Sequence, residues 1–360
     1  MGYYSRTVDF INVYKNQSAA AQYKRFHVDR TIMKNKPNGV EVINWHYHPH
    51  LPRQFVARIP YGRVWGWNGS VITPDNKLLW DVSFEYLHTP KTHPIFQNKL
   101  PSISYIPETL AVITSQVSFN YFHWMFDVLP RLELLRKSNL DYDRIVINRG
   151  KYFTKENCGF QNESLKLLGI SQDKLIECNP ETHILAKNLI VSSMAGYSAH
   201  VPKNVCQFLR KEFLEKITMR KESKYKRIYI SREDSTHRKV LNEEEVFSIL
   251  KKYGFKLIKL SALSFEEKIK LFYGAEVIVS PHGAGLTNLI FCNPGTKIVE
   301  MFTPTYLMPC FHIISNHMDL DYYGLIGEKM PLDESRSNHK DPIVIDIDKL
   351  KKTLKLAEIR

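Results

Sequence analysis

Short apolar runs alternate with segments of helical periodicity along most of the chain, and most regularly from residue 227 onward. In this second half, strands are predicted at 227–230, 255–258, 276–280 and 297–301, with helices at 242–253 and 264–273. Ser264 is followed three residues later by Glu267, the spacing of a capping box at a helix start. Alternation of this kind predicts a parallel sheet covered by helices on both faces.

The first half shows the same alternation after a different beginning. Residues 56–85 are typical of strands and hairpins, with a turn signal at 74–77. Predicted strands follow at 110–114, 144–147 and 189–193, and predicted helices at 119–137, 162–168 and 201–216. We therefore expect an α/β fold with two Rossmann-like doubly wound domains facing a central cleft, because ligands bind at the carboxyl ends of such strands.

The predicted domains follow from a polar, charged stretch around residues 220–224, which has the composition of an interdomain connection. We place an N-terminal domain at 1–218, with its β-rich leading segment, and a second Rossmann-like domain at 219–332. A last strand at 343–346 and a last helix at 348–356 form the segment 333–360.

The composition of the chain limits the cellular compartment and the binding partners that we expect for it. Hydrophobic residues make up 43% and charged residues 24% of the 360 residues, as in an ordinary globular protein. The net charge of +13 favours an anionic partner: nucleic acid, an anionic membrane surface or a phosphorylated substrate. Five cysteines without a CxxC pair favour reduced thiols and a cytoplasmic location. No signal core and no long apolar span occur, so any membrane contact is expected to be peripheral, at the inner face.

The most informative segment is 276–288, which joins a predicted apolar strand to a predicted helix. The turn between them is rich in glycine, and its candidate ligand-binding residues are His282, Gly283, Ala284, Gly285, Leu286, Thr287 and Asn288. Glycine lets backbone N–H groups approach a ligand closely, and a helix N-terminus favours negative charge. The turn therefore suits a diphosphate, although a tight strand-to-helix turn uses glycine for steric reasons alone.

Charged residues at neighbouring strand ends add to this turn. Arg232 follows the predicted strand 227–230, and Arg238 comes six residues later. A guanidinium in that place can pair with phosphate oxygens in bidentate fashion. Glu300, near the end of the next predicted strand, is placed to accept hydrogen bonds from ribose hydroxyls, although it has the alternative of a surface carboxylate.

A second cluster lies in the predicted helix 119–137. His123 and Asp127 are four residues apart, so they share one helix face. In a reaction that attacks a carbon with a hydroxyl group, Asp127 suits the general base, and His123 orients it or the hydroxyl. We assign Asn120, Trp124 and Arg131 of the same segment to acceptor binding. The alternative is a helix whose His and Asp only bond each other.

These motifs together resemble the family 61 glycosyltransferases. The resemblance lies in NYFHWMFDVLPRL at 120–132, in Ser231-Arg232 with Arg238, and in PHGAGLTN at 281–288. It implies a GT-B type fold, an inverting mechanism and a nucleotide-diphosphate sugar donor bound mainly by the second half. It also implies a glycan or lipid-linked saccharide acceptor, as in bacterial capsule or lipopolysaccharide biosynthesis.

No metal ion or other cofactor is expected. The segment 45–50 contains three histidines but no carboxylate or cysteine at fitting spacing, and Asp141-Tyr142-Asp143 precedes a predicted strand instead of ending one.

Two other functions are compatible with part of the sequence. An S-adenosylmethionine-dependent RNA-modifying enzyme would explain the charge and the glycine turn, yet it leaves His123 and Asp127 without a role. No RNP, KH or zinc-finger signature occurs, and no nucleic-acid partner is expected. A glycan-binding module would keep the aromatic residues and dispense with Asp127.

Overall fold

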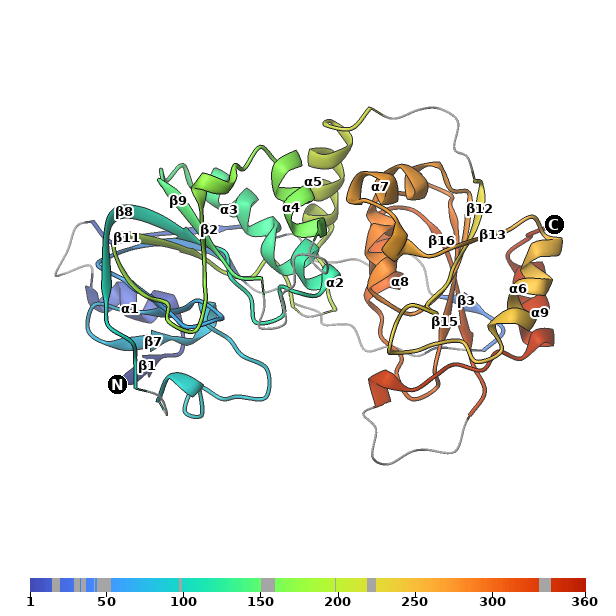
Figure 1. The fold of residues 1–360 in the computed structure, drawn as a ribbon, viewed down its shortest axis with the longest axis horizontal. Coiled ribbons are helices and arrows are strands. Elements are labelled where there is room, and N and C mark those ends of the chain that lie inside the picture. Colours follow the sequence, from blue (N-terminus) through green and yellow to red (C-terminus); the bar gives the residue numbers. More distant parts are fainter. Residues whose placement is uncertain are drawn as a thin grey trace. The chain divides into compact units, whose positions relative to one another are not determined.

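The computed structural model divides into two compact units (Figure 1). It describes residues 1–14, 20–28, 33, 37–41, 43, 53–96, 99–149, 159–197, 199–218, 225–329 and 338–360. Unit 1 comprises Met1–Asp29 and Leu51–Tyr197, and unit 2 comprises Arg30–His50 and Ser198–Arg360. Compared with the domains expected from the sequence, unit 2 begins earlier, so it includes helix α5 (Lys203–Leu214).

Unit 2 is built on a parallel sheet in the order β13-β12-β14-β15-β16-β3. Its strands are β12 (Arg227–Ile230), β13 (Lys256–Ile258), β14 (Val277–Pro281), β15 (Lys297–Phe302), β16 (Asp321–Ile326) and β3 (Asn38–Gly39). The first four confirm the strands predicted in this half. The short β3 is the reason that residues from the first fifty belong to this unit, because it pairs with β16.

Helices cover both faces of this sheet, as predicted (Figure 1). One face carries α6 (Glu243–Lys252) and α9 (Ile347–Leu356), and the other carries α5, α7 (Phe265–Gly274), the 3₁₀ helix η6 (Ala284–Phe291) and α8 (Cys310–His317). The capping box of α7 is present, with Ser264 and Glu267 bonded in both directions. The strand predicted at 343–346 is replaced in the structure by a single bridge between Val240 and Ile343.

The strand order of unit 2 determines where a ligand can bind. From β12 the chain adds β13 on one side and then β14 on the other, so the winding direction reverses between β12 and β14. In open α/β sheets the crevice outside the carboxyl ends of such a pair is the usual ligand site. Arg232 follows β12 and His282 follows β14, so both residues lie at this reversal point.

Unit 1 contains a mixed sheet and not the all-parallel sheet expected, although the strands predicted at 110–114, 144–147 and 189–193 are parallel within it. Its main path is β1-β7-β6-β5-β11-β8-β9-β10, with β4 beside β11 and β2 beside β4. The strands are β1 (Gly2–Tyr4), β2 (Gln22–Phe26), β4 (Gln54–Pro60), β5 (Arg63–Trp65), β6 (Ser70–Ile72), β7 (Lys77–Leu79), β8 (Ser104–Val112), β9 (Arg144–Ile147), β10 (Leu175–Glu177) and β11 (His183–Ser192). The long β11 is parallel to β8 but antiparallel to β4 and β5.

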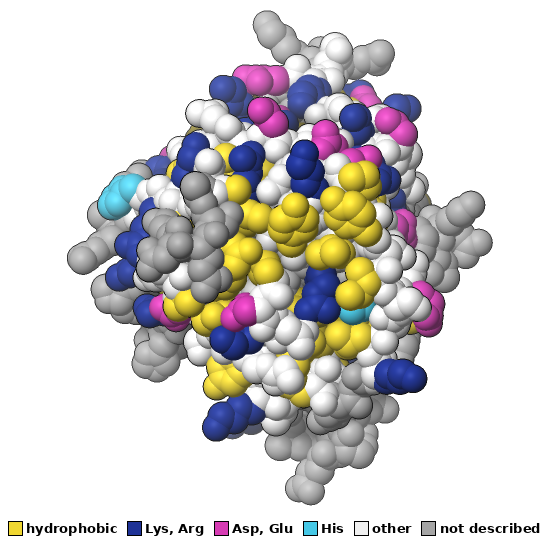
Figure 2. All heavy atoms as spheres, turned by 90° about the vertical axis from the view of Figure 1, so that its left-hand side faces the viewer, with side chains coloured by type: hydrophobic (Ala, Val, Ile, Leu, Met, Phe, Trp, Pro, Cys, Tyr) yellow, Lys and Arg dark blue, Asp and Glu magenta, His cyan; other side chains and the backbone are white. Residues whose placement is uncertain are grey.

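Short helices accompany this sheet. They are α1 (Thr7–Tyr14), α2 (Tyr121–His123), the π-helical turn η3 (Trp124–Val128), α3 (Pro130–Ser138) and α4 (Gly159–Leu167). The core contains buried side chains of α1 and of the sheet, among them Phe10, Val64, Val112 and Leu189. Figure 2 shows hydrophobic side chains gathered in the middle of one face of this part, with Lys and Arg around them. Within the described residues, no helix is both long and apolar enough to span a bilayer.

Candidate active site

The helical segment that carries His123 and Asp127 is interrupted by a π turn. Asn120 caps its start, because its Oδ1 accepts a hydrogen bond of 2.9 Å from the backbone N–H of Phe122. The N–H of Leu129 then bonds to the carbonyl of Trp124, five residues back, at 3.0 Å. The next residue, Pro130, has no N–H to donate and opens α3. Single π turns inside helices occur frequently at functional sites.

His123 and Asp127 are brought together as predicted. Nδ1 of His123 lies 2.6 Å from Oδ2 of Asp127, and their side chains are 19% and 13% exposed. The ring of Tyr86 meets the His123 ring edge-on, with centroids 6.3 Å apart. Because Asp127 engages Nδ1, the imidazole presents Nε2 as its second nitrogen. A carboxylate on Nδ1 fixes the ring orientation and the tautomer.

The three neighbouring residues assigned to acceptor binding make structural contacts within unit 1. Asn120 is the helix cap described above. Trp124 is fully buried and donates from Nε1 to Oγ of Ser164 at 2.9 Å. Arg131 is also buried, and its three guanidinium nitrogens donate hydrogen bonds inside unit 1. The burial of Trp124 and Arg131 gives no support to acceptor binding by these two residues, whereas the assignment of the half-buried Asn120 stays a prediction.

The guanidinium of Arg131 ties α3 to the ends of two strands. Nε and Nη2 donate to the hydroxyl and the carbonyl of Ser192 at 2.9 and 2.8 Å, and Nη1 donates to the carbonyl of Thr114 at 2.5 Å. Burial lowers the pKa of Arg131 to about 10, and the nearby negative charge of Asp127 opposes this shift. Arg131 therefore holds the π turn against the sheet and contributes positive potential beside Asp127.

In unit 2, Arg232 lies directly against the glycine turn. Its Nε and Nη2 donate to the carbonyl of His237 at 3.1 and 3.0 Å, and Nη2 also donates to Oγ of Ser235 at 2.7 Å. A Cβ at Gly283 would overlap with Nη1 of Arg232 and lie 2.7 Å from its Cζ. Gly283 has φ 171°, so glycine is required here for close approach and not for an unusual backbone.

Arg238 is anchored to the same turn. Its Nε donates to the carbonyl of His282 at 2.9 Å, its Nη1 donates to the carbonyl of His339, and its guanidinium carbon lies 5.4 Å from the centre of the Tyr306 ring. Burial lowers the pKa of both arginines, and for Arg232 the neighbouring charge of Arg238 adds to the effect, giving a value of about 10. Two guanidinium groups thus face the reversal point of the sheet.

Glu300 has both carboxylate oxygens bonded inside unit 2, so its placement gives no support to the expected ribose contact. It is fully buried, because β15 continues past it to Phe302 and is flanked by β14 and β16. Its Oε1 lies 2.5 Å from Nδ1 of His282, and its Oε2 accepts a 2.5 Å bond from the hydroxyl of Tyr322. Glu300 thus acts on the turn through His282. Tyr322 was missed, since no motif surrounds it.

The remaining residues of the turn pack inward. Leu286, Thr287 and Asn288 are buried in η6, and Asn288 donates to the carbonyl of Gly285 at 2.9 Å. A Cβ at Gly285 would lie 2.7 Å from Cδ1 of Leu260, so this glycine also serves close packing. The hydroxyl of Thr287 is buried without a hydrogen-bond partner in the described part of the chain. Ala284, half-buried, begins the helix.

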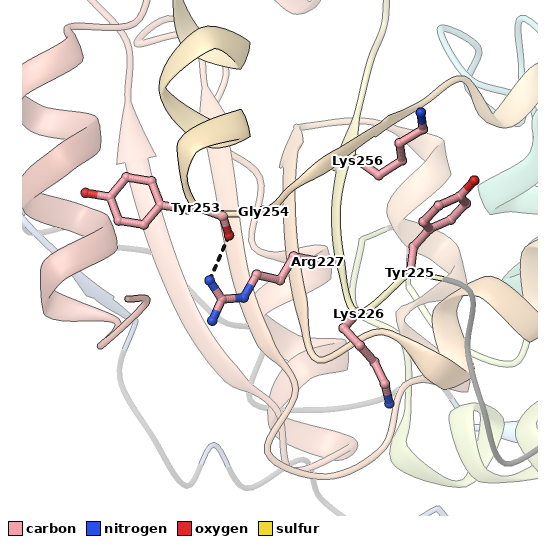
Figure 3. A pocket seen from close by; sticks show the side chains of 6 residues that line it. All are labelled: Tyr225, Lys226, Arg227, Tyr253, Gly254 and Lys256. Carbon is pink, nitrogen blue, oxygen red and sulfur yellow. Dashed lines mark hydrogen bonds between the residues drawn. The ribbon is translucent and has the colours of Figure 1, made fainter.

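The cavity shown in Figure 3 is a different site. It has a volume of about 320 Å³ and is lined by Tyr225, Lys226, Arg227, Tyr253, Gly254 and Lys256. Arg227 and Lys256 are the first residues of β12 and β13, so the cavity lies at the amino ends of the strands. Arg232 and His282 lie at the carboxyl ends, and the cavity therefore takes no part in the site at the glycine turn.

Among the residues that the structure describes, no group of three or more His, Cys, Asp or Glu side chains is placed to hold a metal ion. The histidine-rich segment 45–50 lies outside the described residues.

Comparisons with known proteins agree with the motifs. A family model described as glycosyltransferase 61 matches residues 121–299. The chain is 28% identical to a β-1,2-xylosyltransferase of Arabidopsis thaliana over 125 residues, which cover 29% of this chain and 23% of that protein. It is 33% identical to a β-1,2-xylosyltransferase of Oryza sativa subsp. japonica over 63 residues, 18% of this chain and 12% of that protein.

An animal protein is similar as well. The chain is 27% identical over 81 residues to an EGF domain-specific O-linked N-acetylglucosamine transferase of Gallus gallus, covering 21% of this chain and 15% of that protein. In all three comparisons the match spans about a quarter or less of the relative's own length. The region matched by the family model contains His123, Asp127, Arg232 and the glycine turn. Residues 121–299 therefore place the chain in the glycosyltransferase 61 family.

Proposed function

We propose that the protein is an inverting glycosyltransferase that moves a sugar from a nucleotide-diphosphate sugar to a hydroxyl group of a glycan acceptor. The acceptor oxygen attacks the anomeric carbon and forms the new glycosidic bond, while the bond from that carbon to the diphosphate oxygen breaks. The acceptor proton passes to a base, and the nucleotide diphosphate leaves. The observation that carries this proposal is the pairing of two guanidinium groups with the glycine turn at the reversal point of the unit 2 sheet.

We assign the base to the His123–Asp127 pair. From the sequence, Asp127 was the base and His123 its partner, but the hydrogen bond to Nδ1 favours the reverse division of roles. With Nδ1 held by Asp127, Nε2 of His123 takes the proton, and the carboxylate stabilises the imidazolium that forms. Such an arrangement of carboxylate and imidazole is a general-base unit in unrelated enzymes.

The leaving diphosphate requires positive charge and hydrogen-bond donors. Arg232 and Arg238 supply charge, and the backbone N–H groups at the start of η6 supply donors. His282, held by Glu300, adds an imidazole to the same place. We propose that these groups bind the diphosphate and that transfer requires no metal ion. Arginine is suited to this work because its planar fork matches phosphate geometry.

The relatives suggest the first donors to examine. Two of them are named xylosyltransferases and one an N-acetylglucosamine transferase. We propose UDP-xylose and UDP-N-acetylglucosamine as the first candidates. A GT-B type fold and an acceptor of the surface-polysaccharide type, reached at the inner membrane face, are proposed on the sequence resemblance. The doubly wound strand order of unit 2 supports the fold assignment.

A thermal-shift panel followed by product analysis tests the function. A ligand that binds only the native state raises the melting temperature, so UDP, GDP, CMP, UDP-xylose, UDP-N-acetylglucosamine and S-adenosylmethionine are compared. We expect a nucleotide diphosphate to stabilise the protein and S-adenosylmethionine to have no effect. An α-linked donor should then give a β-linked product by NMR, and transfer should persist in excess EDTA. Stabilisation by S-adenosylmethionine alone would reject the proposal.

A further inference from the structure

A short segment before the His123–Asp127 pair, residues 83–86, has alternating inward and outward side chains. Ser83 accepts a 2.8 Å bond from the backbone N–H of Val71, and the buried carboxylate of Glu85 accepts a 2.9 Å bond from Asn68. The intervening Phe84 is 41% exposed. The backbone N–H of Tyr86 is held in turn by Oε1 of Gln116 at 2.5 Å. The segment is therefore fixed on one side and presents rings on the other.

The exposed and half-buried rings near this segment form a continuous row that reaches His123. The Trp80 and Phe84 centroids are 5.5 Å apart, those of Phe84 and Tyr86 are 5.1 Å apart, and the Tyr86 ring lies 6.3 Å from the His123 ring. All three ring contacts are edge-to-face, with interplanar angles of 69°, 77° and 63°. Such contacts stabilise neighbouring aromatic rings, because the ring quadrupoles favour an edge-to-face arrangement over a face-to-face sandwich.

The next residue, Leu87, has an unusual backbone. Its φ is 65°, in the left-handed region, and its side chain is fully exposed. Neither the left-handed backbone nor the full exposure of a branched apolar side chain stabilises the isolated protein. Residues held in sparsely populated backbone regions occur preferentially at ligand clamps and active sites. Leu87 thus gives the turn after Tyr86 an exposed apolar side chain on an uncommon backbone conformation.

We propose that Phe84 and Tyr86 form the acceptor-sugar subsite, in which their rings bind the C–H face of a pyranose whose hydroxyl reaches His123. A pyranose with equatorial hydroxyl groups presents axial C–H bonds on its faces, and an aromatic face covers these while the hydroxyl groups remain available for hydrogen bonds. Tyrosine gives large contact area at a low cost in side-chain freedom. The subsite rests on the proposed function, because it places the acceptor beside the proposed base.

Saturation-transfer NMR with methyl β-D-glucopyranoside, recorded on the full chain, tests the subsite. We expect protons H1, H3 and H5, which share one ring face, to receive more saturation than H2 and H4. In a titration, Tyr86→Ala and Phe84→Ala should each raise the dissociation constant by about tenfold or more, whereas Tyr86→Phe and Phe84→Tyr should stay within about twofold of wild type. Tyr105→Ala, an exposed ring on β8, is the matched control and should change nothing.

Failure of the subsite and failure of the proposed function give different results. The same preparations are examined with the nucleotide panel, where both alanine variants should be stabilised as wild type is. Stabilisation by a nucleotide diphosphate, combined with glucoside binding that is absent or unchanged in both alanine variants, would overturn the subsite alone. No stabilisation of the wild-type protein by any nucleotide diphosphate would overturn the proposed function, and the subsite with it.

Discussion

Nδ1 of His282 and Oε1 of Glu300 lie 2.5 Å apart at the point where β14 passes into the glycine turn. The second oxygen of Glu300 accepts a bond from Tyr322, so the carboxylate has a fixed orientation in a fully buried position. The His282 ring is further enclosed by Phe302, Tyr306 and Phe311, with ring centroids 5.4, 5.6 and 5.2 Å away. A buried carboxylate therefore sets the orientation of the first side chain of the turn.

Glu300→Gln should weaken nucleotide-diphosphate binding although Glu300 does not touch the ligand. The substitution keeps the size of the side chain but removes the charge that holds His282, and a hydrogen bond to a charged group contributes about 1.5–3 kcal/mol. Isothermal titration should show a correspondingly higher dissociation constant. Tyr322→Phe removes only one bond to Oε2 and should have a smaller effect. An unchanged affinity in a folded Glu300→Gln protein would contradict the positioning role.

Arg232→Ala should weaken binding of the same ligand by about 1.5–3 kcal/mol, because a charged donor to the diphosphate is lost. Arg227→Ala is the matched control: Arg227 begins the strand that Arg232 follows, and it donates to the carbonyl of Tyr253 at 2.7 Å. Titration of both variants should show normal affinity for Arg227→Ala. Equal losses in the two variants would argue against a donor site at the carboxyl end of β12.

Gly283→Ala should disturb the donor site through a steric contact. The added methyl group would overlap with the guanidinium of Arg232, so this side chain must leave its place against the turn. We expect a loss of nucleotide affinity of about tenfold, the change that 1.4 kcal/mol produces. Gly159→Ala, where the nearest atom to the new methyl group is 3.4 Å away, is the control and should bind normally. Normal binding by Gly283→Ala would show that Arg232 acts from another position.

Arg131→Met should destabilise unit 1. It leaves the carbonyls of Thr114 and Ser192 without their buried donors, and each unsatisfied group costs about 1–3 kcal/mol. We expect a fall in the free energy of unfolding of about 3–5 kcal/mol, measured by chemical denaturation. Arg136→Met, on the exposed face of the same helix, should stay within about 0.5 kcal/mol of wild type. Equal stabilities for the two variants would contradict the structural role of Arg131.

Sequence patterns predicted those elements that depend on residues close together in the chain. The strand 276–280, the glycine turn and the pairing of His123 with Asp127 were recovered, because each depends on residues close in sequence. Helix α8 was missed since all eight of its residues are buried, and a helix buried all round lacks the amphipathic period. The mixed sheet of unit 1 was missed because β11 pairs with strands more than a hundred residues away.

Site roles were harder to predict than site positions. Arg131 lies in a predicted motif and Glu300 in a predicted strand, yet each is buried, with its polar atoms bonded inside its own unit. A motif gives the residue type and the spacing, whereas the direction of a side chain depends on what packs around it. For Glu300 this depends on β16, and for Arg131 on the end of β11, and both partners are distant in sequence from the predicted segment.

The measurement that tests the central claim most directly is the transfer rate of Asp127→Asn. The substitution preserves size and removes the negative charge beside Nδ1 of His123. We predict that kcat falls by about 10²–10⁴, the usual contribution of general-base catalysis, while donor affinity and melting temperature stay close to wild type. Glu108→Gln, whose carboxylate pairs with Arg144, should transfer normally. Near-normal turnover by Asp127→Asn would contradict the assignment of the base to the His123–Asp127 pair.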